Sequence, residues 1–148
     1  MPYAHLLVPT DGSQRSEAAI HHAVALAQDN NAQLTLMHVQ ARIPMPAIGM
    51  GELLDPNSLD TLIQASESDS KKILKAASAI AASASLVANC ELVTGNMPHK
   101  AIVDMARRLN CDLIVMASHC RRGLEGMLLG SETQRVLLDA PCPVLVYR

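Results

Sequence analysis

The sequence predicts an α/β protein with a five-stranded parallel open sheet that is covered by helices on both faces. Five short apolar runs alternate strictly with segments of helical spacing along the 148 residues. Such alternation is typical of parallel sheets, because each connection between parallel strands has to cross over a face of the sheet. Right-handed crossovers leave few topologies. We predict the strand order 3-2-1-4-5 in a single domain that spans residues 1–148.

The N-terminal part of the chain predicts a strand, a turn, a helix and a second strand. The apolar run His5–Val8 is the first strand, and the turn-forming letters PTDGS at 9–13 end it. The next helix reaches about Asp29, and its small residues at helical spacing let it lie close to a sheet. After the Asn30-Asn31 break, Leu34–Val39 is the second strand.

We predict that residues 40–57 form the least regular part of the chain, because this segment contains three prolines and two glycines. Apolar residues at helical spacing then predict a long helix. The polar stretch ASESDSKK interrupts its apolar face, so part of this helix should extend beyond the sheet. The apolar positions are Leu59, Leu62, Ile63, Ile73, Leu74, Ala77, Ile80, Ala81 and Ala84.

The third strand is predicted at Leu86–Val93, and Thr94-Gly95 turns the chain after it. Pro98 fits the first position of the next helix, where a missing N–H has no consequence. Asn110 can end that helix in a left-handed conformation.

The C-terminal part holds the longest loop, which lies between predicted strands at Leu113–Met116 and Val144–Tyr147. About a dozen residues with three glycines lead from the first of these strands to a short helix, and loops of this length are often functional. Ser131 and Gln134 form the S-x-x-Q pattern of a capping box, so we predict Ser131 as the N-cap of that helix.

Composition excludes several classes of protein. The chain has no Phe or Trp and two Tyr, so its core must consist of Ala, Leu, Ile, Val and Met. The formal charge of −2 does not indicate a nucleic-acid surface. No apolar run approaches the roughly 18 residues of a membrane span, so we expect no membrane insertion. The N-terminus lacks a signal-like basic region, and the cysteines show no CxxC spacing, which together favour a cytoplasmic protein with reduced thiols.

One crevice is the expected binding site. Open α/β sheets bind ligands outside the carboxyl ends of their strands, where the strand order reverses. If the first and fourth strands are neighbours, Asp11 faces the loop that runs from Ser118 to Gly130. The first N–H groups of the helix at Ser131 could hold a phosphate oxygen there. The structural alternative is that the capped glycine loop only turns the chain.

Four segments together resemble the universal stress protein family. They are LLVPTDGS near the start, MHV at the end of the second strand, TGNMPHKAIVDMA before the fourth strand and MASHCRRGLEGMLLGSETQRVLLDAPCPVLVYR at the end. The resemblance covers essentially the whole chain except the segment rich in Pro and Gly. It implies a Rossmann-like, flavodoxin-like sheet and ATP as the cofactor, with or without Mg²⁺.

The nucleotide-binding branch of that family has the pattern G-x2-G-x9-G-[S/T], and this chain matches it in spacing. Gly130 and Ser131 are present, but Ala117 and Cys120 replace the first two glycines. If position 120 needs a positive φ, a side chain there costs about 1–3 kcal/mol. Cys120 could therefore either weaken nucleotide binding or abolish it. We expect that binding is retained.

By this resemblance, Asp11 and the backbone of Val39 would hold the adenine and the ribose, and the glycine loop would hold the phosphates. Arg121 would either neutralise the phosphates or belong to a solvated loop face. The implied nucleotide-binding residues are Pro9, Thr10, Asp11, Val39, Met116, Ala117, Ser118, Cys120, Arg121, Gly130, Ser131 and Glu132.

The pair His119-Cys120 could suggest a metal ligand set, but no further ligands follow at a recognisable spacing, so we expect no metal site. We also find no G-x-S-x-G, H-E-x-x-H or G-x(4)-G-K-[ST] pattern and expect no catalytic residues. His38 is interpreted as a histidine with satisfied hydrogen bonds at the edge of the core.

The resemblance implies a cytoplasmic regulatory protein of the stress response that binds an adenine nucleotide. It also implies a homodimer through the last strand and an unknown protein partner, without nucleic acid. One alternative is a nucleotide-free scaffold or chaperone-like dimer, which Cys120 would explain. The second alternative is a slow ATPase.

Overall fold

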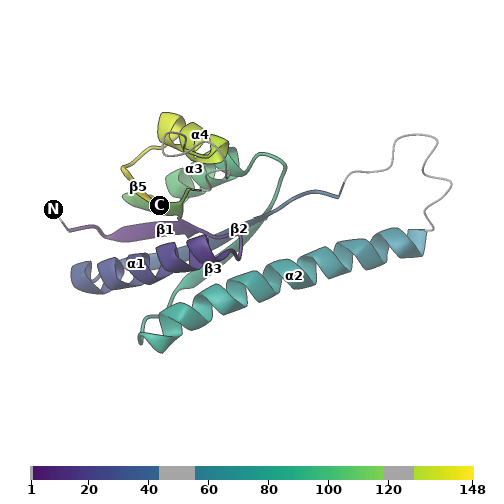
Figure 1. The fold of residues 1–148 in the computed structure, drawn as a ribbon, viewed down its shortest axis with the longest axis horizontal. Helices are drawn as coiled ribbons and strands as arrows, with labels where there is room; N and C mark the ends of the chain where they lie inside the picture. Colours follow the sequence, from purple (N-terminus) through teal and green to yellow (C-terminus); the bar gives the residue numbers. More distant parts are fainter. Residues whose placement is uncertain (1, 44–55, 119–128) are drawn as a thin grey trace.

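The computed structural model describes residues 2–43, 56–118 and 129–148. Figure 1 shows a sheet between two layers of helices. The strand order is β3-β2-β1-β4-β5, and all four neighbouring pairs are parallel. The predicted fold class and strand order are therefore confirmed.

Strands and helices alternate along the chain as predicted. The strands are β1 (His5–Pro9), β2 (Gln33–Gln40), β3 (Asn89–Thr94), β4 (Leu113–Ala117) and β5 (Val144–Tyr147). The helices are α1 (Gln14–Asn30), α2 (Pro56–Ser83), α3 (Pro98–Arg108) and α4 (Ser131–Asp139).

Strand β1 lies in the middle of the sheet, with β2 on one side and β4 on the other. Leu6 is level with Leu34 of β2 and with Leu113 of β4. The turn after β1 therefore lies between the ends of its two neighbours. This is the point at which the chain winds in opposite directions on the two sides, and ligands of such sheets bind there.

Alternate residues of the strands pack against two separate helix layers. Leu6 belongs to a cluster with α1 and α2, whereas Leu7 belongs to a cluster with α3 and α4. This alternation follows from the two-residue repeat of a strand, because both faces of the sheet are covered. The buried hydrophobic residues of the described segments are Ala, Leu, Ile, Val, Met and one Cys, in agreement with the composition.

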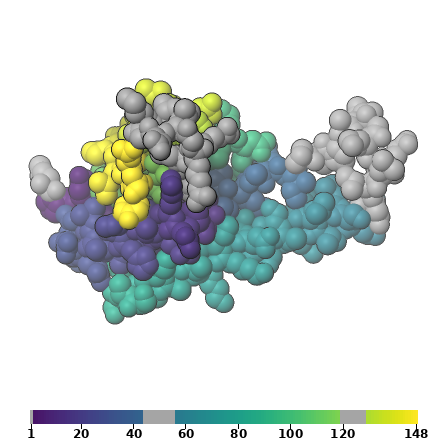
Figure 2. All heavy atoms as spheres, viewed as in Figure 1, coloured from purple at the N-terminus to yellow at the C-terminus, as the bar shows by residue number. Residues whose placement is uncertain are grey.

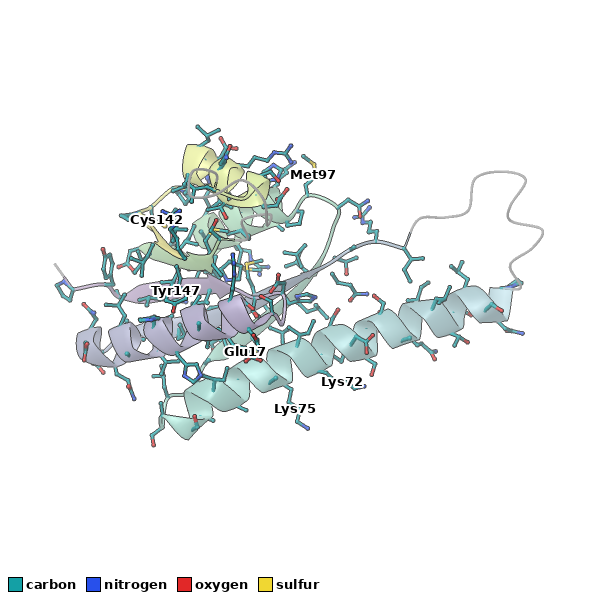
Figure 3. The ribbon with its side chains drawn as sticks, viewed as in Figure 1. Glu17, Lys72, Lys75, Met97, Cys142 and Tyr147 are labelled. Atoms are coloured by element: carbon teal, nitrogen blue, oxygen red, sulfur yellow. The ribbon has the colours of Figure 1, made fainter. Side chains whose placement is uncertain are left out.

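The first half of α2 extends beyond the sheet, as the polar stretch in its sequence predicts (Figures 1 and 2). The buried residues of this helix, Ser70, Leu74, Ala77 and Ala81, all lie in its second half. Leu62, in the first half, is 50% exposed. In Figure 3, Lys72 and Lys75 lie along this helix on the side away from the sheet.

Several predicted boundaries are confirmed and others are wrong. Asn110 follows Leu109, the C-cap of α3, and has a φ of 52°, so its predicted left-handed conformation is confirmed. Asn31, in the predicted break, is the C-cap of α1 and has a φ of 53°. The predicted start of β3 at Leu86 is wrong, because the strand begins at Asn89. Ser85 has a φ of 60°, so the chain turns out of α2 over several residues before it becomes extended. The predicted irregular segment is also too long, since β2 reaches Gln40 and α2 includes residues 56 and 57.

Candidate functional site

A cleft of about 240 Å³ opens at the carboxyl ends of β1, β2 and β4, next to the first turns of α3 and α4. Its position is the one that the strand order predicts for a ligand site. The described residues that line it are Pro9, Thr10, Asp11, Ser16, His38, Val39, Pro98, Ile102, Met116, Ala117 and Glu132.

Local hydrogen bonds hold the turn between β1 and α1 at this cleft. The Asp11 carboxylate accepts the N–H of Ser13 at 2.9 Å, which forms a tight turn, and Gly12 has a φ of +79°. The hydroxyl of Ser13 in turn accepts the N–H of Ser16 and caps α1. Asp11 is therefore held at the cleft by the start of the helix.

Buried hydroxyl groups support this turn from below. The hydroxyl of Thr10 donates to that of Ser16 at 3.1 Å and accepts the N–H of Gly12 at 3.2 Å. The N–H of Thr10 donates to the carbonyl of Met37 at 2.8 Å, which joins the turn to β2. Thr10 and Ser16 are both buried at the base of the cleft, so these bonds satisfy polar groups that have little access to water.

The end of β2 brings His38 and Val39 to the cleft. The Nδ1 atom of His38 lies 2.8 Å from the carbonyl oxygen of Thr10, and it must carry the proton because a carbonyl only accepts. The prediction that His38 has satisfied hydrogen bonds is confirmed for this nitrogen. Its place in the cleft wall was not predicted.

Ser118, directly after β4, is a junction of three hydrogen bonds. Its N–H donates to the carbonyl of Tyr147 at 2.9 Å, and its hydroxyl accepts the N–H of Gly130 at 3.2 Å. Its carbonyl accepts a hydrogen bond from Nη1 of Arg15 at 3.1 Å. Ser118 is buried and connects α1, β5 and the start of α4 at one point.

The predicted capping box at the start of α4 is wrong. Gly130 is the N-cap, and it supplies no side chain to the first turn. Gln134 is then the fourth residue of the helix instead of the third position that a capping box needs. Its side-chain amide donates to the carbonyl of Leu129 at 2.8 Å.

Glu132 joins the start of α4 to the start of α3. One carboxylate oxygen accepts the backbone N–H of His99 at 2.8 Å and its Nδ1–H at 3.0 Å. The other lies 3.3 Å from Nη1 of Arg135. His99 is the second residue of α3. The N-cap of this helix, Met97, which Figure 3 labels, makes no side-chain capping bond. Glu132 therefore caps α3 from another helix, which no local pattern in the sequence could indicate.

The cleft brings together seven of the twelve predicted nucleotide-binding residues, namely Pro9, Thr10, Asp11, Val39, Met116, Ala117 and Glu132. Gly130 and Ser131 lie at the start of α4, and Ser118 is buried beside them. Cys120 and Arg121 lie outside the described residues. The sequence interpretation did not identify Ser16, His38, Pro98 and Ile102 as lining residues.

The described segments contain no cluster of three or more His, Cys, Asp and Glu side chains that could hold a metal ion. None of their helices has the length and apolar character needed to cross a membrane. The cysteines among them are free, and Cys90 is exposed whereas Cys111 is buried. Burial raises the pKa of the Cys111 thiol to about 11, with smaller contributions from the nearby Cys142 and Asp112.

Comparisons with known proteins agree on one family. The model of the universal stress protein family matches residues 2–148. A universal stress protein of Methanocaldococcus jannaschii is 34% identical over 149 residues, which cover 99% of this chain and 82% of that protein. The structure of UspA from Lactobacillus plantarum is 27% identical, with a TM-score of 0.81 and coverage of 100% and 99%. A universal stress protein in complex with cAMP is also 27% identical, with a TM-score of 0.67 and coverage of 100% and 98%.

Proposed function

Because this chain belongs to the universal stress protein family, we propose that it is a regulatory protein of the stress response that binds an adenine nucleotide. The observation that carries the proposal is that Asp11 after β1, Val39 of β2 and Ala117 of β4 line one cleft at the switch point. The related structure with bound cAMP supports an adenine nucleotide as the ligand class.

The walls of the cleft suit a purine base and a sugar. Val39, Ile102 and Met116 supply apolar surface for a flat ring, and Asp11 supplies a hydrogen-bond acceptor for ribose hydroxyls. A volume of about 240 Å³ is below the usual range for whole ligands of this size, which suggests that the base and ribose enter and the phosphates lie outside.

The phosphates would lie at the start of α4. Gly130 has no side chain and makes no capping bond there, so the first N–H groups of the helix can approach an anion. ATP, with or without Mg²⁺, is among the adenine nucleotides that we propose as ligands. In this proposal, the phosphates are surrounded by Ser118, Cys120, Arg121, Ser131 and Glu132.

We also propose a cytoplasmic homodimer that pairs through β5. This strand is an edge of the sheet, and Leu145 in its middle is 46% exposed. Exposed edges of sheets are usually covered. Nucleotide binding would change the surface beside the cleft and so favour one protein partner through a population shift.

Calorimetric titration with ATP, with and without Mg²⁺, tests the nucleotide proposal. We expect binding to the wild type and its loss in Asp11→Ala. Asp104→Ala is the control, because this carboxylate is exposed on α3 and does not line the cleft. Release of phosphate in the same samples would indicate the slow ATPase.

A second candidate, a nucleotide-free scaffold or chaperone-like dimer, rests on the replacement of a motif glycine by Cys120. If millimolar ATP gives no heat with the wild type and Cys120→Gly restores binding, this candidate is supported and the nucleotide proposal is wrong for the natural chain.

A further inference from the structure

The helices α3 and α4 both begin at the cleft, and a helix N-terminus attracts anions through its free N–H groups and its dipole. At α3, the anion that occupies the helix N-terminus is a side-chain carboxylate of the protein. The carboxylate of Glu132 accepts the N–H of His99, the second residue of α3, at 2.8 Å. A phosphate of a bound nucleotide therefore cannot use this helix terminus without displacing Glu132.

Three donors fix this carboxylate in the wall of the cleft. They are the backbone N–H and the Nδ1–H of His99 and the guanidinium of Arg135, at 2.8, 3.0 and 3.3 Å. The Glu132 side chain is nevertheless 39% exposed and lines the cleft. The exposed Arg135 guanidinium offsets part of the negative charge of Glu132, and the charge that remains is held in place beside any ligand in the cleft.

The charges of the described lining residues have one sign. Asp11 and Glu132 are acidic, and the described lining includes no Lys or Arg. His38 uses its Nδ1–H for the carbonyl of Thr10. Like charges that share a small, partly buried site repel one another more strongly than they would in water. The electrostatic repulsion between a ligand and these side chains therefore increases with the number of phosphates that the ligand carries.

We propose that Glu132 is a specificity-determining residue that lowers the affinity of the cleft for adenine nucleotides as their phosphate charge increases. The preferred ligand class is then adenosine and adenosine monophosphates, ahead of free ATP. This inference rests on the proposed binding of adenine nucleotides. It adds a preference among them and names the side chain that sets it.

The test compares adenosine, AMP and ATP by calorimetry in EDTA, so that no metal neutralises the phosphates. We expect the wild type to bind AMP more tightly than ATP. Glu132→Gln should strengthen ATP binding about tenfold and change adenosine binding less than twofold, because it removes one charge and keeps an acceptor for His99. The matched control is Glu91→Gln, whose carboxylate is 37% exposed, pairs with Arg108 and lies outside the cleft lining.

The salt dependence of the wild type provides a measurement that needs no variant. If repulsion dominates, added NaCl screens it, so the affinity for ATP should rise while that for adenosine stays constant. A fall in ATP affinity with salt would overturn the inference. The inference would also be overturned if the ratio of ATP affinity to adenosine affinity were the same in the wild type and in Glu132→Gln. Absence of binding by all three compounds would instead reject the proposed function and the inference together.

Discussion

The hydroxyl of Ser118 accepts the backbone N–H of Gly130 at 3.2 Å, so that a single hydrogen bond joins the end of β4 to the start of α4. The same serine donates its own N–H to Tyr147, the last residue of β5. The start of α4, at the cleft, and the edge strand β5 are therefore both bonded to one buried residue. This arrangement gives the first of five predictions.

Ser118→Ala should destabilise the fold by about 1–2 kcal/mol, because it removes a buried acceptor and leaves the N–H of Gly130 without it. Urea denaturation measures this change, and ATP titration should show weaker binding. Ser68→Ala on the exposed part of α2 is the control and should be neutral. Equal stabilities of the two variants would show that the hydrogen bond does not stabilise the fold.

Gly12→Ala should destabilise the protein by about 1–3 kcal/mol. Gly12 has a φ of +79°, and an added Cβ would lie 3.1 Å from Cγ1 of Ile73 on α2. Gly95→Ala is the matched control, since its Cβ would meet nothing within 4 Å. Midpoints of chemical denaturation separate the two, and a Gly12→Ala midpoint equal to that of Gly95→Ala would contradict the prediction.

Asp112→Asn should reduce stability near neutral pH but much less in acid. Burial raises the pKa of the Asp112 carboxyl, yet hydrogen bonds from the N–H groups of Ala4 and His5 outweigh it and lower the pKa below the ordinary 3.8. A lowered pKa contributes stability above the unfolded-state value, and this contribution is lost as the pH falls through the folded-state value. Urea unfolding at about pH 7 and about pH 3 measures the difference in unfolding free energy between the wild type and Asp112→Asn. A difference that is the same at both pH values would contradict the lowered pKa of Asp112.

Cys111 should resist alkylation while Cys90 reacts. The pKa of about 11 leaves Cys111 with about one thiolate in a thousand at pH 8, and the residue is buried. Burial also raises the pKa of Cys142, which should react more slowly than the exposed Cys90. Iodoacetamide labelling followed by tandem mass spectrometry gives the rate for each residue. Labelling of Cys111 as fast as Cys90 would refute the prediction.

Leu145→Lys should weaken self-association, since it places a charge in the middle of the exposed strand β5. Val87→Lys, near the opposite edge of the sheet at an exposed position, is the control and should leave the oligomeric state unchanged. Light scattering at micromolar concentration measures both variants. A wild-type protein that runs as a monomer would remove the basis of the dimer proposal.

The fold could be predicted from sequence because its signals are local. The apolar run at Leu113 and the asparagines at positions 31 and 110 determine elements through contacts with near neighbours, and the alternation of elements then restricts the topology. The start of β3 was misplaced because the residues from Leu86 are as apolar as a strand, although the turn at Ser85 delays the extended conformation.

The candidate site was predictable only in part, because some of its residues are positioned by contacts between segments that are distant in sequence. Asp11 follows β1 and Ala117 ends β4, so both could be assigned from strand order. The bond from Glu132 to His99 spans 33 positions, and Gly130 took the N-cap position that Ser131 was predicted to hold. The bond to His99 leaves no trace in local sequence, because it depends on how α3 and α4 pack. The N-cap was misplaced by one position because glycine and serine, adjacent here, are both suitable N-cap residues.

The ring of Tyr147 contacts that of His22 on α1, with centroids 4.7 Å apart, and it offers an intrinsic fluorescent probe. The chain has no tryptophan and only two tyrosines, so its ultraviolet emission comes from very few rings. Tyr147 sits on the strand proposed to pair in the dimer, and its carbonyl holds the N–H of Ser118 beside the cleft. Replacing Tyr3 by phenylalanine would leave one emitting ring, at a position where the proposed dimer pairing and the proposed nucleotide binding should each change its intensity.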